Sequence, residues 1–137
     1  MKTLIVYRSF LGTSEKYAKW LHEAVPSDLL EFKRANREVL KIYDAVVIIC
    51  GIYATRLSLA GYLGQNWAVL QGKQVAFVSV AGSPADNIFS TKAYSRIPGN
   101  IRSSITHFHL AGGMGRINAS EVKKENIHPV IDYLMTK

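Results

Sequence analysis

The sequence has little of what disulfide-bonded, metal-binding or membrane-spanning proteins need. It holds one cysteine, Cys50, in 137 residues, which excludes an internal disulfide and a cysteine-rich metal cluster. No apolar run approaches the roughly 20 residues of a membrane-spanning helix. The opening residues 1–7 are too short for the hydrophobic part of a signal peptide. The length is that of one domain, so we expect a single cytoplasmic domain over residues 1–137.

Acidic residues are also scarce. The chain has 17 Lys and Arg against 10 Asp and Glu, which gives a formal net charge of +7. Hydrophobic residues make up 48% of the chain and charged residues 20%, a balance that excludes a disordered protein. A basic surface attracts anionic lipid, nucleic acid or an acidic redox protein. The basic residues form two loose groups, Lys33, Arg34, Arg37 and Lys41, and then Lys92, Arg96 and Arg102. No nucleic-acid-binding motif accompanies them, so we expect no sequence-specific nucleic-acid binding.

Short apolar runs alternate with helical patterns along the chain. The runs predict five strands, at 4–7, 28–33, 44–50, 75–80 and 106–110. Helices are predicted at 14–25, 57–70, 100–104 and 127–135, the last beginning or kinking near Pro129. This alternation is typical of an α/β fold, in which a parallel sheet carries helices on both faces. Such sheets bind ligands at the carboxyl ends of their strands, so the loops there are the informative part of the sequence.

The loop after the first strand combines hydroxyl groups with a glycine just before a helix. It reads Ser9-Phe10-Leu11-Gly12-Thr13-Ser14. The N–H groups of the first helical turn and the helix dipole together make an anion site at such a position. The alternative is that Thr13 or Ser14 simply caps the helix. No lysine follows the glycine and no GxGxxG occurs, so the loop is neither a Walker loop nor a dinucleotide fingerprint.

Two further strand-end loops carry small residues and one aromatic. The second-loop residues are Ile52, Tyr53, Ala54 and Thr55, and the third-loop residues are Ala81, Gly82 and Ser83. Tyr53 can form a wall for a flat ligand, and the small residues of the third loop leave room and turn the chain sharply. Taken together, the three loops predict a phosphorylated, planar ligand.

In this order and at this spacing, the loops resemble those of the flavodoxin family, and the resemblance covers nearly the whole chain. The first loop is similar to the family's phosphate loop, roughly Thr/Ser-x-Thr-Gly-x-Thr. Residues 43–54 resemble its third strand and second flavin loop, and residues 72–83 its fourth strand and third loop. The resemblance implies a flavodoxin-like three-layer sandwich with strand order 2-1-3-4-5, and FMN as cofactor. It also implies that residues 9–14 hold the phosphate and that the second and third loops flank the isoalloxazine ring.

Three positions depart from the family pattern. Leu11 stands where a hydroxyl is usual. A lost hydrogen bond is worth ~1 kcal/mol, or about twice that to a charged group, so we expect FMN affinity to be lowered about tenfold or more. Thr55 occupies a position often held by glycine, and Arg8 one where a small residue is common. Electron-carrier flavodoxins are usually acidic. This basic chain, with Arg8 and Arg56 in its ligand loops, is therefore expected to stabilise reduced flavin and to raise its potential.

A basic subgroup of the family fits this charge better. The run 105–114 resembles the fifth strand and following loop of the menaquinone-dependent protoporphyrinogen oxidases and their small relatives. That resemblance implies electrons passing from a tetrapyrrole through FMN to a quinone at the membrane, in heme biosynthesis. Such an enzyme carries an extra loop near its last strand, for which 137 residues leave little room.

Three function classes therefore stay open. They are an FMN electron-transfer protein, an FMN enzyme acting on a porphyrinogen or quinone, and a flavodoxin-fold module without FMN that binds a protein. The expected partner is a redox protein or a quinone, with the basic face allowing peripheral association with a membrane surface. FMN carries its own redox chemistry, so the sequence predicts no catalytic side chain.

Two histidines on the predicted fifth strand raise a metal-binding alternative. His107 and His109 alternate and so share a face, but no nearby cysteine or carboxylate completes a ligand set. We therefore expect ordinary strand histidines near the sheet edge and no metal. Cys50, at the end of a buried strand, is expected to be a small core residue.

Overall fold

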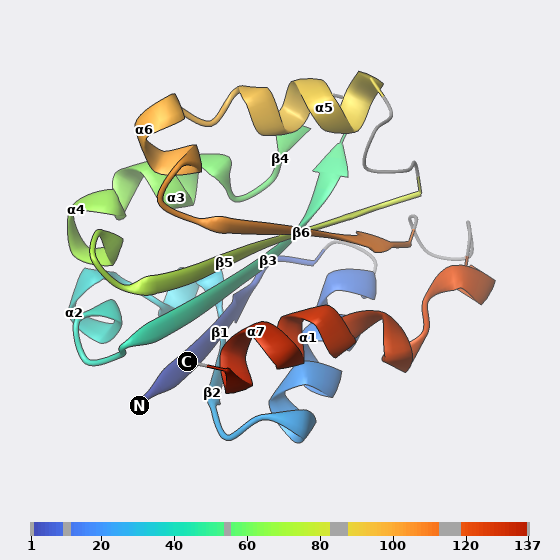
Figure 1. Cartoon of the computed structure of the whole chain (residues 1–137), viewed down its shortest axis with the longest axis horizontal. Helices are drawn as coiled ribbons and strands as arrows, with labels where there is room; N and C mark the ends of the chain where they lie inside the picture. The colour runs from blue at the N-terminus through green and yellow to red at the C-terminus, as the bar shows by residue number, and fades with distance from the viewer. Residues whose placement is uncertain (1, 10–11, 54–55, 83–87, 113–118, 137) are drawn as a thin grey trace.

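The fold is built on a parallel sheet whose strands follow the order β2-β1-β3-β5-β6. The computed structural model describes residues 2–9, 12–53, 56–82, 88–112 and 119–136 (Figure 1). The five long strands are β1 (Thr3–Tyr7), β2 (Asp28–Glu31), β3 (Ala45–Tyr53), β5 (Gln74–Ala81) and β6 (Thr106–Ala111). All four pairings between them are parallel. A two-residue strand, β4 (Arg56–Leu57), pairs antiparallel with the end of β3. The predicted order of the five long strands, 2-1-3-4-5, is confirmed.

The central strands are buried on both faces, as their continuous apolar runs predict. Val46, Val47 and Ile48 of β3 have no exposed surface, and neither has Phe77 of β5. The two edge strands differ, because most residues of β2 and β6 are only half-buried. Full burial of the middle strands requires a helical layer on each side of the sheet.

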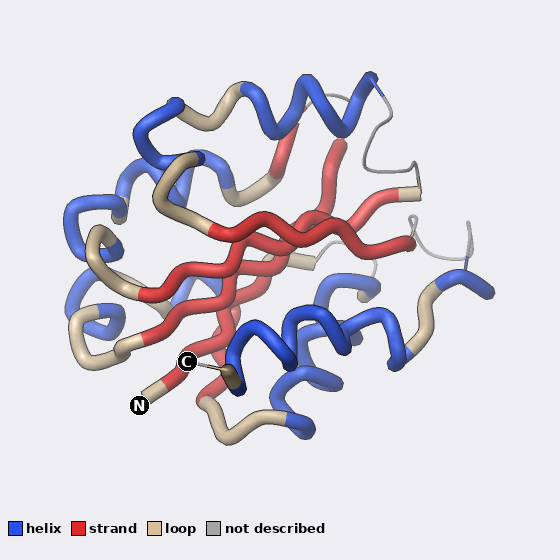
Figure 2. The backbone as a smooth tube through the Cα atoms, viewed as in Figure 1, coloured by secondary structure: helices blue, strands red, loops and turns tan. Residues whose placement is uncertain are grey.

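Two helical layers cover the sheet (Figures 1 and 2). The first consists of α1 (Thr13–Ala24) and α7 (His128–Met135), whose Tyr17, Leu21, Val130 and Leu134 join one core cluster. The second consists of five short helices, whose residues join the other cluster. These helices are α2 (Arg37–Leu40), α3 (Ala60–Gln65), α4 (Trp67–Leu70), α5 (Ile88–Ser95) and α6 (Gly99–Arg102). No helix in the described ranges is long and apolar enough to span a bilayer.

Several element boundaries differ from the sequence prediction. The strand predicted at 28–33 ends at Glu31, whose carboxylate accepts a hydrogen bond from the Lys33 N–H at 3.0 Å and caps a 3-10 turn, η1 (Phe32–Arg34). The helix predicted at 57–70 is divided at Asn66, whose Nδ2 donates to the Tyr62 carbonyl at 2.8 Å. The third strand runs three residues beyond the predicted end at Cys50, to Tyr53. Local side-chain hydrogen bonds and strand pairing therefore override the apolar pattern at these ends.

Two helices were not predicted at all. The helix α2 is a single turn that begins where the Asn36 side chain accepts the Val39 N–H at 3.0 Å. The helix α5 has no pronounced apolar stripe, although Ala93 is buried against the sheet. The C-terminal helix α7 has Pro129 in its first turn, as the sequence predicts. Two 3-10 turns, η2 (Ala119–Glu121) and η3 (Lys124–Ile127), lead into it.

A buried hydroxyl group joins the two histidines of the edge strand β6. Ser79 Oγ on β5 lies 2.8 Å from His107 Nε2 and 3.0 Å from His109 Nδ1. The Tyr94 ring of α5 stacks on the His107 ring, with 4.0 Å between the centroids. The histidines thus share a face at the sheet edge, as predicted. In the described part of the chain, no group of three or more His, Cys, Asp or Glu could hold a metal ion.

Burial makes His107 a pH-dependent element of stability. Burial, and secondarily the neighbouring His109, lower the pKa of His107 from 6.5 to about 4. Between these two values the unfolded chain binds more protons than the folded one, so the free energy of unfolding falls as pH drops from about 6.5 to about 4. We expect urea unfolding to show this loss, and His107→Phe, which keeps an aromatic ring against Tyr94, to flatten it. His128→Gln, at an exposed position on α7, is the control. If the free energy of unfolding of His107→Phe depends on pH as in the wild type, another group causes the loss of stability.

Candidate functional site

The carboxyl ends of β1, β3 and β5 lie next to one another along one edge of the sheet. Tyr7 of β1 pairs with Ile49 of β3, and Gly51 of β3 pairs with Val80 of β5. The chain leaves β1 with β2 on one side and β3 on the other, which is the switch point where parallel sheets bind ligands. The strand ends that lead into the three loops singled out in the sequence therefore lie at the same edge of the sheet (Figure 1).

The first loop brings a glycine, not a hydroxyl, to the start of α1. Gly12 is the N-cap of the helix and has a left-handed φ of +95°, a conformation that strongly favours glycine. The Ser9 Oγ accepts the Gly12 N–H at 2.9 Å and closes the loop. Among the described residues no side chain caps α1, and Thr13 and Ser14 lie within its first turn. The capping alternative is thus wrong for Thr13 and Ser14, and the helix terminus has the form of an anion site.

A second set of contacts holds this helix terminus against the last strand. The Gly112 N–H donates to the Ala81 carbonyl at 2.9 Å. A Cβ on Gly112 would lie 2.8 Å from Thr13 Cγ2, 3.1 Å from Val80 Cγ1 and 3.2 Å from Val122 Cγ2. Gly112 is therefore the point where the first loop, the end of β5 and the segment before α7 meet, and it has no room for a side chain.

Tyr17 reinforces the same junction from inside α1. Its hydroxyl donates to the Ala111 carbonyl and accepts a hydrogen bond from Asn126 Nδ2 at 3.0 Å. The Asn126 side chain also donates to the Glu121 carbonyl at 2.8 Å. Sequence reasoning missed Gly112, Tyr17 and Asn126 as parts of the site, because residues 17 and 126 are 109 positions apart and share no local motif.

The second loop differs from the prediction. Ile52 and Tyr53 belong to β3, and the chain returns as β4 with Ile52 paired to Leu57 and Tyr53 to Arg56. The first two residues of the predicted loop are therefore paired strand residues. The Ser58 N–H donates to the Gly51 carbonyl at 3.1 Å and fixes the return of the chain. The Tyr53 side chain, Ala54 and Thr55 lie outside the part that the structure describes.

The third loop begins one residue later than predicted, since Ala81 is the last residue of β5. Ala81 is half-buried and Gly82, directly after it, is exposed. Phe10, Leu11 and Ser83 belong with the residues that the structure does not describe. The backbone thus brings Ser9, Gly12, Thr13, Ser14, Ile52, Ala81 and Gly82 to the same edge of the sheet.

Arg8 places a positive charge between the first and second loops. Its backbone N–H donates to the Ile49 carbonyl at 3.1 Å, which extends the β1–β3 pairing by one residue. Its Nη1 donates to the Ser58 carbonyl at 3.2 Å, and its guanidinium carbon lies 5.1 Å from the centroid of the Phe32 ring. Carbonyl and ring both favour a cation, so these contacts hold the charge at the ligand edge.

Cys50 is a core residue, as predicted. Its side chain is fully buried, and burial raises the pKa of the thiol to about 11. Hydrogen bonds from the Ser58 and Leu59 region and the Arg8 charge oppose this rise without reversing it. The thiol is therefore protonated near neutral pH and is a poor nucleophile.

Comparisons with known proteins agree with this geometry. A family model described as a flavodoxin domain matches residues 4–128. A search of curated protein sequences finds no match. Among solved structures, oxidised Flavodoxin 2 from Bacillus cereus has a TM-score of 0.68 at 16% identity and covers 100% of both chains. A flavodoxin from the domain Archaea has a TM-score of 0.66 at 17% identity and covers 98% of this chain and 99% of its own.

A third structure carries the cofactor in its name. A flavoprotein from Lactobacillus acidophilus in complex with FMN has a TM-score of 0.57 at 15% identity and covers 80% of this chain and 91% of its own. At such identities the structures establish the fold, while the family match runs over most of the sequence. The family match over residues 4–128 and the strand order together show that the chain belongs to the flavodoxin domain family, whose cofactor is FMN.

Proposed function

We propose that this protein is an electron-transfer flavoprotein that binds FMN at the carboxyl edge of its sheet. The observation that carries the proposal is the start of α1, where Gly12 replaces a capping side chain and hydroxyl-bearing residues stand on either side. A phosphate there would accept hydrogen bonds from the first-turn N–H groups and gain from the helix dipole.

The residues present fit the two ends of FMN. Residues 9–14 would hold the phosphate through backbone N–H groups and the hydroxyls of Ser9, Thr13 and Ser14. Ring contacts would come from residues 52–55 and 81–83, where Gly82 allows a close approach of the backbone. When bound, FMN supplies the one- and two-electron chemistry, so the side chains of this protein need only bind, orient and tune it.

Arg8 is the residue best placed to tune the potential. Reduction adds negative charge to the ligand site, and a guanidinium held by the Ser58 carbonyl and the Phe32 ring would stabilise that charge. A cation at this site differs from the acidic character that the family resemblance implies for electron carriers. Arg8 thus supports a role in which the flavin accepts electrons readily.

The carrier role is proposed ahead of the porphyrinogen oxidase role. The strand β6, which covers most of the run that resembles that subgroup, is the fifth strand of the flavodoxin-like order and so does not favour an oxidase over a carrier. Gly113 and Met114 of that run lie outside the described ranges. An assay of protoporphyrinogen oxidation with a menaquinone acceptor separates an oxidase from a carrier. Rapid turnover there would replace the carrier role by the oxidase role.

The direct test is titration of the flavin-free protein with FMN. We expect quenching of flavin fluorescence with a dissociation constant in the micromolar range or below, about 8 kcal/mol of binding free energy. Riboflavin, which lacks the phosphate, should bind more weakly. If FMN does not bind at micromolar concentration, the chain is a flavodoxin-fold module with another role.

Gly112→Ala tests the proposed phosphate site through the contact between Gly112 and Thr13. The added Cβ would press on Thr13 Cγ2 at 2.8 Å and displace the start of α1, so FMN affinity should fall about tenfold while riboflavin affinity changes little. Gly61→Ala is the matched control, because a Cβ there meets no atom within 4 Å. Tyr17→Phe, which removes the hydroxyl bonded to Ala111, should weaken FMN binding less. If Gly112→Ala binds FMN as tightly as the wild type, the contacts at Gly112 do not position the phosphate site.

Arg8→Gln tests the charge. Loss of one cation near the ring should lower the two-electron midpoint potential by on the order of 30 mV, equivalent to about 1.4 kcal/mol. Arg8→Lys keeps the charge and should stay close to the wild-type potential. Spectroelectrochemical titration of the FMN-loaded proteins measures both. Equal potentials in all three proteins would show that Arg8 does not act on the flavin.

A further inference from the structure

The positive charge of this protein is concentrated in one of its two helical layers. The layer of α2 to α6 and its connections, residues 32–44, 58–73 and 88–105, carries eight cations and two carboxylates, a net +6. The layer of α1 and α7, residues 12–27 and 119–136, carries four cations and five carboxylates, a net −1. We call the first layer the cationic face; its cations are Lys33, Arg34, Arg37, Lys41, Lys73, Lys92, Arg96 and Arg102.

Most of this charge is at the surface. All the cations of the cationic face except Lys73 are exposed. Its two carboxylates are already engaged: Glu38 Oε1 lies 3.1 Å from Lys41 Nζ, and Asp44 Oδ2 accepts the backbone N–H of Lys2 at 2.8 Å. The field of the remaining cations is therefore not cancelled locally.

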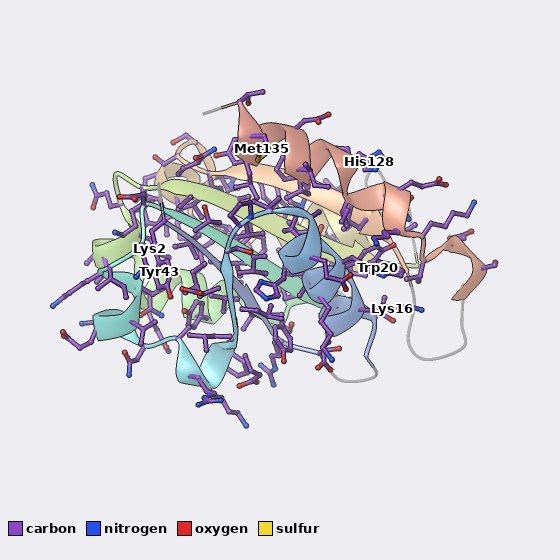
Figure 3. All side chains as sticks on the ribbon, turned by 90° about the horizontal axis from the view of Figure 1, so that it is seen from below. Lys2, Lys16, Trp20, Tyr43, His128 and Met135 are labelled. Atoms are coloured by element: carbon purple, nitrogen blue, oxygen red, sulfur yellow. The ribbon has the colours of Figure 1, made fainter. Side chains whose placement is uncertain are left out.

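The other layer has nearly equal numbers of cations and carboxylates. Lys19 Nζ lies 3.2 Å from Glu15 Oε2, one helical turn away on α1. Lys16 Nζ lies 5.1 Å from the centroid of the Trp20 ring, and the two side chains extend from the same helix in Figure 3. The charge difference between the layers has two sources: the cationic face has four more cations and three fewer carboxylates than the layer of α1 and α7. In residues 45–120 the chain has a single acidic residue, Asp86, outside the described ranges.

The middle of the cationic face carries no charge. Residues 57–72, which include α3 and α4, contain no Asp, Glu, Lys or Arg, and their exposed positions are small or amide residues such as Gly61, Gln65 and Ala68. In Figure 1 these helices lie between α2 and the pair α5 and α6. Arg37 Nη2 donates to the Gln65 carbonyl at 2.9 Å and joins one cationic group to this centre. An uncharged centre with a charged rim is the usual arrangement of a protein interface.

The cationic face continues into the proposed flavin edge. The second loop returns through β4 into α3, and α5 begins at Ile88, soon after the third loop. Both segments proposed to flank the ring therefore lead directly into this face. A partner docked on it would lie close to the ligand edge, which electron transfer requires.

We infer that the cationic face is the docking surface for an acidic electron-transfer protein. The choice of an electron-transfer protein as partner rests on the proposed function. Small, polar contact surfaces with opposite charge are characteristic of brief electron-transfer complexes, because they give fast association without tight binding. A membrane fits less well. The exposed large apolar residues of the described chain are Ile42 and Met135, and only Ile42 lies on the cationic face, where insertion into lipid would need several.

Binding of a labelled acidic two-iron ferredoxin tests this inference. Fluorescence anisotropy should show binding at about 20 mM salt that weakens at least about tenfold at about 200 mM salt, because the attraction is screened. The double variant Lys92→Glu with Arg96→Glu should weaken binding about tenfold or more at low salt. The control Lys123→Glu with Lys124→Glu makes the same change in net charge on the opposite layer, at exposed positions, and should change binding less than about threefold.

Three results would overturn the inference. Equal losses in the two double variants would mean that net charge acts without a docking face. Tighter binding to vesicles containing phosphatidylglycerol, lost in Lys92→Glu with Arg96→Glu, would make the face a membrane surface. Tighter binding to duplex DNA through the same residues would make it a nucleic-acid surface.

The measurement is made on both the flavin-free and the FMN-loaded protein. If FMN fails to bind but ferredoxin binding is lost only in the α5 variant, the docking surface stands and the cofactor proposal falls. If FMN binds and neither protein form binds ferredoxin at low salt, the docking inference falls alone.

Discussion

Burial of the middle strands on both faces is the constraint on which the rest of this structure depends. β1, β3 and β5 have almost no exposed side chains, so helices must cover both sides, and every connection must cross from one end of the sheet to the other. The five long strands then run in the same direction and end at the same edge. The first loop and the ends of β3 and β5 come together there for that reason, and the polar, glycine-containing segments of the chain lie where a ligand can reach them.

Contacts with β6 and with the segment before α7 also hold this edge of the sheet in place. Gly112 contacts Thr13 and bonds to Ala81, while the Tyr17 hydroxyl and Asn126 join α1 to the end of β6. The start of α1 is therefore positioned by the last strand and by the segment that precedes α7. The phosphate site proposed at this helix terminus would gain from such support, because the donor groups stay in place without a cost in ordering.

The same layered arrangement separates the charges of the protein. Residues 45–120, which supply α3 to α6, contain one acidic residue, whereas residues 12–27 and 119–136, which supply α1 and α7, contain five of the ten in the chain. Of the net charge of +7, the cationic face carries +6 and the layer of α1 and α7 carries −1. For a flavoprotein of this family, a positively charged face beside the ligand edge would attract an acidic partner and would raise the potential of the flavin.

The sequence by itself determined the class of fold, because continuous apolar runs that alternate with helical patterns are local signals. The order of the five strands followed from the resemblance to the flavodoxin family, and the first loop as an anion site stays a prediction. The sequence also determined Cys50 as a core residue and the shared face of His107 and His109, since alternation on a strand fixes the side that each side chain takes. Only the tertiary structure decided the hairpin at Tyr53, the one-turn α2, the contact of Gly112 with Thr13 and the bond between Asn126 and Tyr17. These features depend on packing between segments far apart in the chain, and no spacing within a short stretch of sequence encodes such contacts.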